Sequence, residues 1–316
     1  MSAGASRRIA AIDIARGLAL VGMGAYHLTW DLAYFGVAPP NLPYAEPMRI
    51  LSHVVGGAFL LLAGVSLGIA HRAGPNWPSY VKRLGIIAAA AALVSAVTYA
   101  IAPNSPIFFG ILHCILAASL LAGPFLEAPA WLALAAGAAA AVAPRLYSST
   151  LFDPPALLWL GLGAHEPSTL DWRPLLPWAG VTLIGLGLAK QLSLARLPRG
   201  RPRGTRGLAF AGRHSLAIYL IHQPVLFGLL YIAMQATGIA DRQASEQYLK
   251  ACRPACVEAG GEIDACDRAC ACVVQKARGG GWSSRWRRVG SRRPSAAGSA
   301  RSWRRVGRTR GETRGQ

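Results

Sequence analysis

The chain has 316 residues, of which 53% are hydrophobic and only 15% are charged. Soluble proteins carry about 25% charged residues, and here the apolar residues fall in runs of about 20, the length that crosses about 30 Å of hydrocarbon as a helix. This composition excludes an ordinary soluble domain and predicts an all-α, polytopic bundle of transmembrane helices.

The net charge of +19 raises the question of nucleic acid binding, but its distribution argues against that partner. Residues 277–316 contain twelve Arg and one Glu, which together give +11 of the charge. Most of the remaining basic residues bracket apolar runs, as is typical of membrane topology signals. We therefore expect a lipid bilayer, and no nucleic acid, as the partner of this chain.

Seven apolar runs predict about seven transmembrane helices. Asp13 and Arg16 interrupt the start of the first run, and the run is too long for the core of a signal peptide, so we expect an uncleaved anchor. The predicted spans are 14–35, 51–70, 84–102, 107–126, 131–144, 178–194 and 216–236.

The segments between these runs differ in basic charge. One set contains eleven Lys and Arg: the N-terminal segment and the loops 71–83 and 195–213. The other set contains three: the loops 36–50, 103–106 and 145–177. Because short cytoplasmic loops are enriched in Lys and Arg, we expect the first set and the N-terminus in the cytoplasm, and the C-terminus on the opposite side.

Ionisable side chains inside a bilayer are costly, so each is a functional hypothesis. His27 and Asp31 share one helix face, since they are four residues apart, and a neighbouring Asp raises the basicity of a His, as a general base requires. His113 and His222 lie in two other predicted spans. Counted from the nearest loops, all three histidines fall near mid-bilayer, where they are expected to converge. The alternative, that each is an interhelical hydrogen-bonding residue, stays open, above all for His113.

Five of the six cysteines follow the last predicted span, in the pattern C-x3-C-x9-C-x3-C with Cys272 beyond it. Each C-x3-C pair shares a helix face, so two disulfides can staple two short helices joined near Gly260. Disulfides require an oxidising compartment, which the predicted topology supplies; a structural zinc site with similar spacing is the alternative. We predict a transmembrane domain over 1–240, a Cys-rich helical hairpin over 241–276 and a disordered, Arg-rich tail over 277–316.

Four ordered segments resemble the bacterial members of the heparan-α-glucosaminide N-acetyltransferase catalytic-domain family. The segments are RIAAIDIARG at 8–17, running on to His27 and Asp31, FLLLAGVSL at 59–67, FGILH at 109–113, and GRHSL with YLIHQP within 212–224. The spacing Arg16-x10-His27 is also similar to an Arg-x10-His element of the broader integral-membrane acyltransferase superfamily.

The resemblance implies an enzyme that moves an acetyl or other acyl group from cytoplasmic acyl-CoA onto an extracytoplasmic sugar or glycan. His27 would be the general base or transient acyl carrier, oriented by Asp31, with His113 and His222 completing the cavity. The basic residues expected to attract the CoA phosphates are Arg16, Arg203 and Arg213. Acetyl-CoA or another acyl-CoA is the expected co-substrate, and no metal site is indicated.

Two other classes of function remain as alternatives. Intramembrane His, Asp and Arg also occur in proton-coupled transporters, although no internal repeat is visible here. A non-catalytic assembly factor would use the Cys-rich hairpin to bind a partner. For the acyltransferase we expect a multi-pass location in the bacterial inner membrane with a periplasmic C-terminus, and association into a homodimer is compatible with the sequence.

Overall fold

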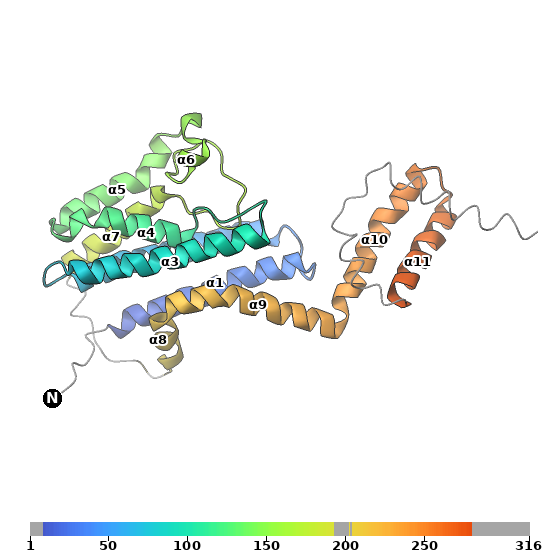
Figure 1. Cartoon of the computed structure of the whole chain (residues 1–316), viewed down its shortest axis with the longest axis horizontal. Helices are drawn as coiled ribbons and strands as arrows, with labels where there is room; N and C mark the ends of the chain where they lie inside the picture. The colour runs from blue at the N-terminus through green and yellow to red at the C-terminus, as the bar shows by residue number, and fades with distance from the viewer. Residues whose placement is uncertain (1–8, 193–201, 203, 280–316) are drawn as a thin grey trace, which may run out of the picture. The chain divides into compact units, whose positions relative to one another are not determined.

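The computed structural model describes residues 9–192, 202 and 204–279, which are mostly helical and contain no strand (Figure 1). Contacts divide the chain into two compact units, Met1–Leu226 and Phe227–Gln316. The all-α prediction is confirmed. Arg203 and all but the first three residues of the predicted tail 277–316 lie outside the described residues, and the predicted domain boundaries stay predictions.

Each of the seven predicted spans overlaps a helix. The helices concerned are α1 (Ala10–Tyr34), α2 (Glu46–Ala70), α3 (Trp77–Ile101), α4 (Ile111–Ala122), α5 (Ala130–Leu146), α7 (Leu175–Gln191) and α9 (Ser215–Thr237). The short elements η1 (Leu42–Tyr44), η2 (Pro124–Leu126), η3 (Thr150–Phe152), α6 (Pro155–Leu158) and α8 (Arg206–Arg213) lie between them.

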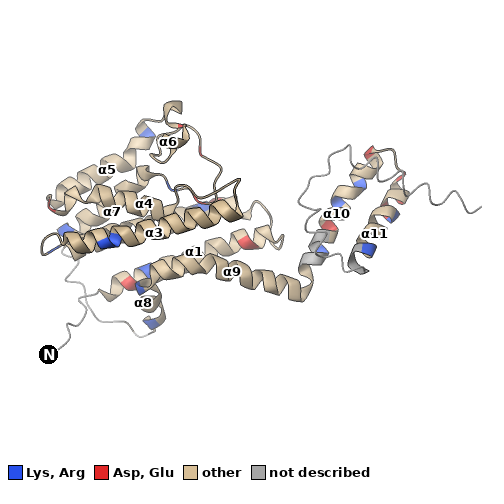
Figure 2. Cartoon of the chain, viewed as in Figure 1, with Lys and Arg blue, Asp and Glu red and all other residues tan. Residues whose placement is uncertain are grey.

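The helices have the character of a membrane protein. Among the described residues, α2, α3 and α9 are long and apolar enough to cross a bilayer, while α4 and α5 are shorter apolar helices. Charged side chains are sparse along α3, α4 and α9 (Figure 2). Large apolar side chains such as Val97 on α3 are exposed. Such a surface suits hydrocarbon and is costly in water.

Helix α7 packs between α2 and α5, and glycines at the contacts allow its backbone to lie close to the backbones of both neighbours. A Cβ atom added to Gly64 of α2 would overlap the carbonyl oxygen of Thr182, and one added to Gly185 of α7 would overlap that of Leu61. On its other side, α7 presents Gly180 to Gly137 of α5. Small residues let membrane helices approach closely enough for extensive van der Waals contact.

The start of α1 is held by α8 in a similar way. A Cβ atom on Gly17 would overlap the backbone of Leu208, and one on Gly212 would overlap the carbonyl of Asp13. This approach places Arg213 Nε 4.0 Å from Asp13 Oδ2. The pair joins a carboxylate and a guanidinium at the predicted cytoplasmic end of the first span.

The second unit contains a helical hairpin, α10 (Ile239–Glu258) and α11 (Ile263–Gly279). The chain turns at Gly260, whose φ of +89° favours glycine. The predicted pair of disulfides is confirmed: Cys252 joins Cys270, and Cys256 joins Cys266. These four sulfurs are therefore unavailable to zinc, which removes the alternative of a four-cysteine metal site.

Replacing Gly64 with Ala tests the packing of α7. The added methyl group would overlap backbone atoms of α7, and overpacking of this kind costs about 1–3 kcal/mol. We expect a lower melting temperature in detergent. Gly85→Ala on α3 is the matched control, because nothing lies within 4 Å of its added Cβ. Equal melting temperatures for the two variants would contradict this packing.

Candidate active site

Two of the predicted histidines meet. His27 on α1 lies seven residues before the end of that helix at Tyr34, and His222 lies on α9. His222 Nε2 is 3.3 Å from His27 Nδ1, and the two rings pack edge to face with centroids 4.8 Å apart. The contact joins residues that are 195 positions apart in sequence.

The surrounding hydrogen bonds assign the protons of this pair. His222 Nδ1 lies 2.6 Å from the Tyr219 carbonyl, so it carries hydrogen and donates, and His222 Nε2 is left as an acceptor when the ring is neutral. His27 Nδ1 faces two acceptors, His222 Nε2 and the Met23 carbonyl at 2.9 Å, so it also carries hydrogen. The neutral His27 ring then has its lone pair on Nε2, which makes no hydrogen bond among the described residues.

Asp31 bonds to a residue that the spacing did not indicate. Its side chain is only 3% exposed, and Oδ1 accepts a 2.7 Å hydrogen bond from Gln223 Nε2. Asp31 is one helical turn beyond His27, as predicted. Its hydrogen bond, however, is to Gln223, the residue next to His222 on α9. Asp31 Oδ2 and Gln223 Oε1 are buried without a hydrogen-bond partner among the described residues.

His113 occupies a separate hydrogen-bonded cluster. Ser95 Oγ donates to the Ile107 carbonyl at 2.6 Å, so it accepts from His113 Nε2 at 3.1 Å. His113 Nδ1 accepts from the backbone N–H of Gly110 at 3.3 Å. Both ring nitrogens are therefore engaged at the start of α4. Tyr219 connects the two regions, since it packs against the α4 residues and its ring lies 5.7 Å from that of His222.

Two of the three predicted phosphate-binding arginines, Arg16 and Arg213, lie toward the other end of α1. Arg16 donates to Ser66 Oγ on α2 at 2.6 Å, and it precedes His27 by eleven residues, about 16 Å along the helix. Arg213 faces Asp13. Arg203 lies outside the described residues. Within the described ranges, no group of three or more His, Cys, Asp or Glu side chains is arranged to hold a metal ion.

Sequence reasoning missed Arg173, which it counted only as a loop charge. Its guanidinium bonds Ser52 Oγ and donates to the Ser52 carbonyl at 3.3 Å. It also lies 5.6 Å from the centre of the Trp178 ring, against which His53 packs. Gly22 of α1 faces Val55 of the antiparallel α2, so this cluster is about level with His27. No local pattern joins Arg173 to a residue 121 positions away.

Residues 8–224 match the family model described as Heparan-alpha-glucosaminide N-acetyltransferase, catalytic. The matched segment begins just before α1 and ends inside α9, so it includes both histidines of the pair, Asp31 and Gln223. No curated protein and no solved structure matches the chain.

The bond between Asp31 and Gln223 predicts a measurable coupling. In Gln223→Leu the buried carboxylate loses its hydrogen-bond donor, which costs about 1–3 kcal/mol, so the melting temperature in detergent should fall. Adding Asp31→Leu removes the unpaired carboxylate and should restore part of the loss, with a coupling energy of about 0.5–3 kcal/mol. Gln191→Leu at the exposed end of α7 serves as the control. Additive effects of the two substitutions would argue against the bond.

Proposed function

The chain belongs to the heparan-α-glucosaminide N-acetyltransferase catalytic family, and on this basis we propose that it transfers an acyl group from cytoplasmic acyl-CoA to an extracytoplasmic sugar or glycan. Family membership implies acetyltransferase activity in a membrane. We further propose that the donor is acyl-CoA, that transfer runs from the cytoplasm to an acceptor outside it, and that the protein lies in the bacterial inner membrane.

The hydrogen-bonded His27–His222 pair is the observation that carries the proposal, because its geometry leaves the lone pair of a neutral His27 ring on Nε2. In direct transfer, this nitrogen takes the proton from the acceptor's amino or hydroxyl group as that group attacks the thioester carbonyl. The C–S bond then breaks, and the departing CoA thiolate takes the proton from His27. If Nε2 attacks the carbonyl instead, the C–S bond breaks, CoA leaves as its thiolate and an acyl-histidine forms. The acceptor then attacks this acyl group, the N–C bond to His27 breaks, and the acceptor's proton passes to the thiolate. Both routes require the lone pair on Nε2 and hydrogen on Nδ1.

His222 has the role that a carboxylate has in many catalytic triads. Its Nε2 accepts the hydrogen bond from His27 Nδ1, which fixes the tautomer and helps to spread the positive charge that develops when His27 is protonated. Asp31 acts one step further away, because its bond to Gln223 holds the turn of α9 that carries His222. His113 fixes the start of α4, against which Tyr219 packs, and so acts as a positioning residue.

One end of α1 suits the acceptor sugar, and the other end suits the phosphates of the acyl donor. His27 lies toward the end that is predicted to be extracytoplasmic, where an acceptor sugar would arrive. Arg16 lies about 16 Å away, toward the predicted cytoplasmic end, and with Arg213 and Arg203 it would favour the phosphates of acyl-CoA. An extended donor lying along α1 and α2 would place its phosphates and its acyl group at opposite ends.

The activity test uses purified protein in detergent with radiolabelled acetyl-CoA and a panel of amino sugars and glycans. Wild type should consume acetyl-CoA and label an acceptor, and His27→Ala should lower kcat by about 100-fold to 10,000-fold, as expected for loss of a general base. His222→Phe should lower kcat by a smaller factor, because His27 keeps Nε2 but loses its hydrogen-bond acceptor.

His165→Ala is the matched control, since His165 is exposed and pairs with Asp153 in the connection before α7. Full activity in His27→Ala would exclude His27 as the base or acyl carrier. Absence of acetyl-CoA consumption by folded wild type with every acceptor would favour the transporter or the assembly factor.

A further inference from the structure

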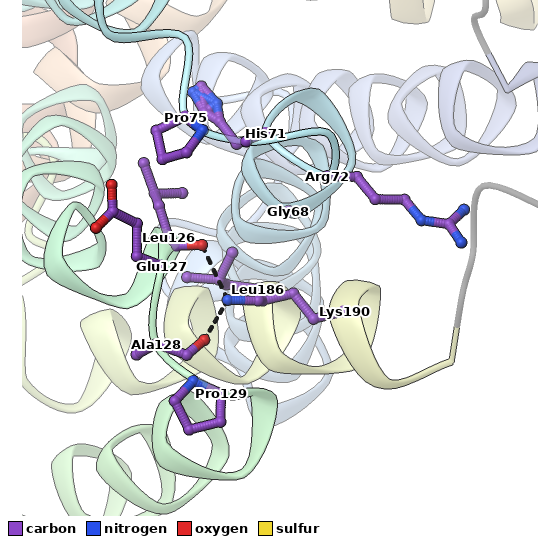
Figure 3. A pocket seen from close by; sticks show the side chains of 11 residues that line it. Gly68, His71, Arg72, Pro75, Leu126, Glu127, Ala128, Pro129, Leu186 and Lys190 are labelled. Carbon is purple, nitrogen blue, oxygen red and sulfur yellow. Dashed lines mark hydrogen bonds between the residues drawn. The ribbon is translucent and has the colours of Figure 1, made fainter.

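The pair formed by Asp31 on α1 and Gln223 on α9 contains two buried oxygens without a hydrogen-bond donor. Gln223 Nε2 donates to Asp31 Oδ1 at 2.7 Å, but Asp31 Oδ2 and Gln223 Oε1 have no partner among the described residues. Lys190, by contrast, donates all three ammonium hydrogens to backbone carbonyls in the segment 125–128, beside a cavity of about 510 Å³ (Figure 3). A buried acceptor that lacks a donor is costly. The two oxygens therefore indicate a hydrogen that a carboxylate and an amide do not supply to each other.

The neighbouring side chains do not supply this hydrogen. Nδ1 of His27, one turn before Asp31, directs its hydrogen toward the Met23 carbonyl and His222 Nε2. His222 Nδ1 donates to the Tyr219 carbonyl. Within the described ranges, Asp31 forms no ion pair with a Lys, Arg or His side chain. An ionised Asp31 would therefore carry an uncompensated charge in a side chain that is only 3% exposed, which is costly inside a bilayer.

One proton on Asp31 removes these costs together. A carboxylic acid has one O–H donor and keeps an acceptor oxygen. With the hydrogen on Oδ2, Asp31 can donate to Gln223 Oε1 while Oδ1 still accepts from Gln223 Nε2. Each side chain then supplies one donor and one acceptor to the other, and no charge is buried.

We infer that Asp31 is a neutral carboxylic acid that forms two hydrogen bonds with Gln223, and that this acid–amide pair fastens α9 to α1 beside His222. Its role in catalysis rests on the proposed function. Two bonds restrict the rotation of Gln223 that a single bond would allow. They fix the turn of α9 that presents His222 Nε2 to His27 Nδ1. Asp31 is thus a positioning residue that acts through Gln223.

A neutral Asp31 also suits a base at position 27. Residues four apart on a helix have Cβ atoms about 5–6 Å apart, and a carboxylate at that distance favours the protonated form of a histidine. A protonated His27 has no lone pair on Nε2 and cannot take a proton from the acceptor. With Asp31 neutral, His27 stays unprotonated until the acceptor attacks, and it then passes the proton to the CoA thiolate.

Infrared difference spectroscopy of the full-length protein in detergent tests the protonation of Asp31 directly, because the carbonyl stretch of a protonated carboxyl group is separate from the carboxylate bands. The spectrum of wild type minus Asp31→Asn at neutral pH should contain the band of a protonated carboxyl group. Asp264→Asn is the matched control, since Asp264 is an exposed residue of the helical hairpin. Its difference spectrum should contain carboxylate bands only.

Two substitutions of Asp31 test the paired bonds. The amide of Asp31→Asn can repeat both bonds, because it has an N–H donor and an oxygen acceptor, whereas Asp31→Leu can form neither. Asp31→Leu should lower the melting temperature by several degrees and kcat by about tenfold or more, since misplacement of a catalytic group by about 1 Å can cost about a hundredfold. Asp31→Asn should recover most of both losses.

The outcomes separate this pair from the proposed function. A protonated carboxyl band from Asp31, with recovery in Asp31→Asn, supports the pair even if no acceptor is labelled. Carboxylate bands in its place overturn the inference and indicate a bound water molecule as the donor to both oxygens. Asp31→Asn as unstable as Asp31→Leu overturns it as well, and activity that depends on His27 would then leave the proposed function standing. If Asp31→Leu fails to fold, the infrared spectrum and the melting temperature of Asp31→Asn still decide.

Discussion

Hydrocarbon offers no hydrogen bonds, so a polar side chain inside this bundle has to be satisfied by the protein itself. His222 meets this constraint by donating to a carbonyl of its own helix, His113 by bonding a serine and a backbone N–H, and Lys190 by capping three carbonyls. The same constraint makes the exceptions informative. Among the described residues, Asp31 Oδ2, Gln223 Oε1, Ser119 Oγ and both nitrogens of His71 are buried without a hydrogen-bond partner. Nε2 of the half-buried His27 has no hydrogen bond there either, since the bonds of that ring are made by Nδ1.

Two of these groups, His27 Nε2 and the His71 ring, lie toward different ends of the first unit. One lies toward the end of α1, beside a histidine that accepts its other hydrogen. The other, His71, lies just beyond the end of the antiparallel α2. Arg16 connects α1 to α2 between them through Ser66. A donor bound at one end with its acyl group at the other would link the cytoplasm to an acceptor across the membrane.

The fold was predictable from the sequence because its signals are local. Runs of apolar residues predict each helix without knowledge of its neighbours, and the two C-x3-C pairs predict a stapled hairpin because residues four apart share a helix face. The close packing of α7 was only partly predictable, since the sequence shows where the glycines are but not which backbone each one contacts.

The candidate site was predictable only as a set of residue types. The spacing of His27 and Asp31 indicated a direct pair, but the Asp31 hydrogen bond goes to Gln223, 192 positions away. Counting residues from the ends of each predicted span put His113 at the same depth as His27 and His222. In the structure His113 bonds Ser95 and the backbone N–H of Gly110 instead. Arg173 had no local signal, because it lies in the connection before α7 and its partner Ser52 is on α2, 121 positions away. Tertiary contacts of this kind depend on how helices associate, which residue spacing does not encode.

The most direct test of transmembrane acyl transfer by the His27–His222 pair uses sealed proteoliposomes with an amino sugar enclosed and radiolabelled acetyl-CoA outside. Vesicles are sorted so that the loop 71–83 is accessible from outside, and the same sugar, in a distinguishable isotopic form, is added there. Transfer across the membrane by His27 predicts that label accumulates on the enclosed sugar with wild type and not with His27→Ala. Label only on the external sugar, or equal labelling by the His27 variant, would contradict it.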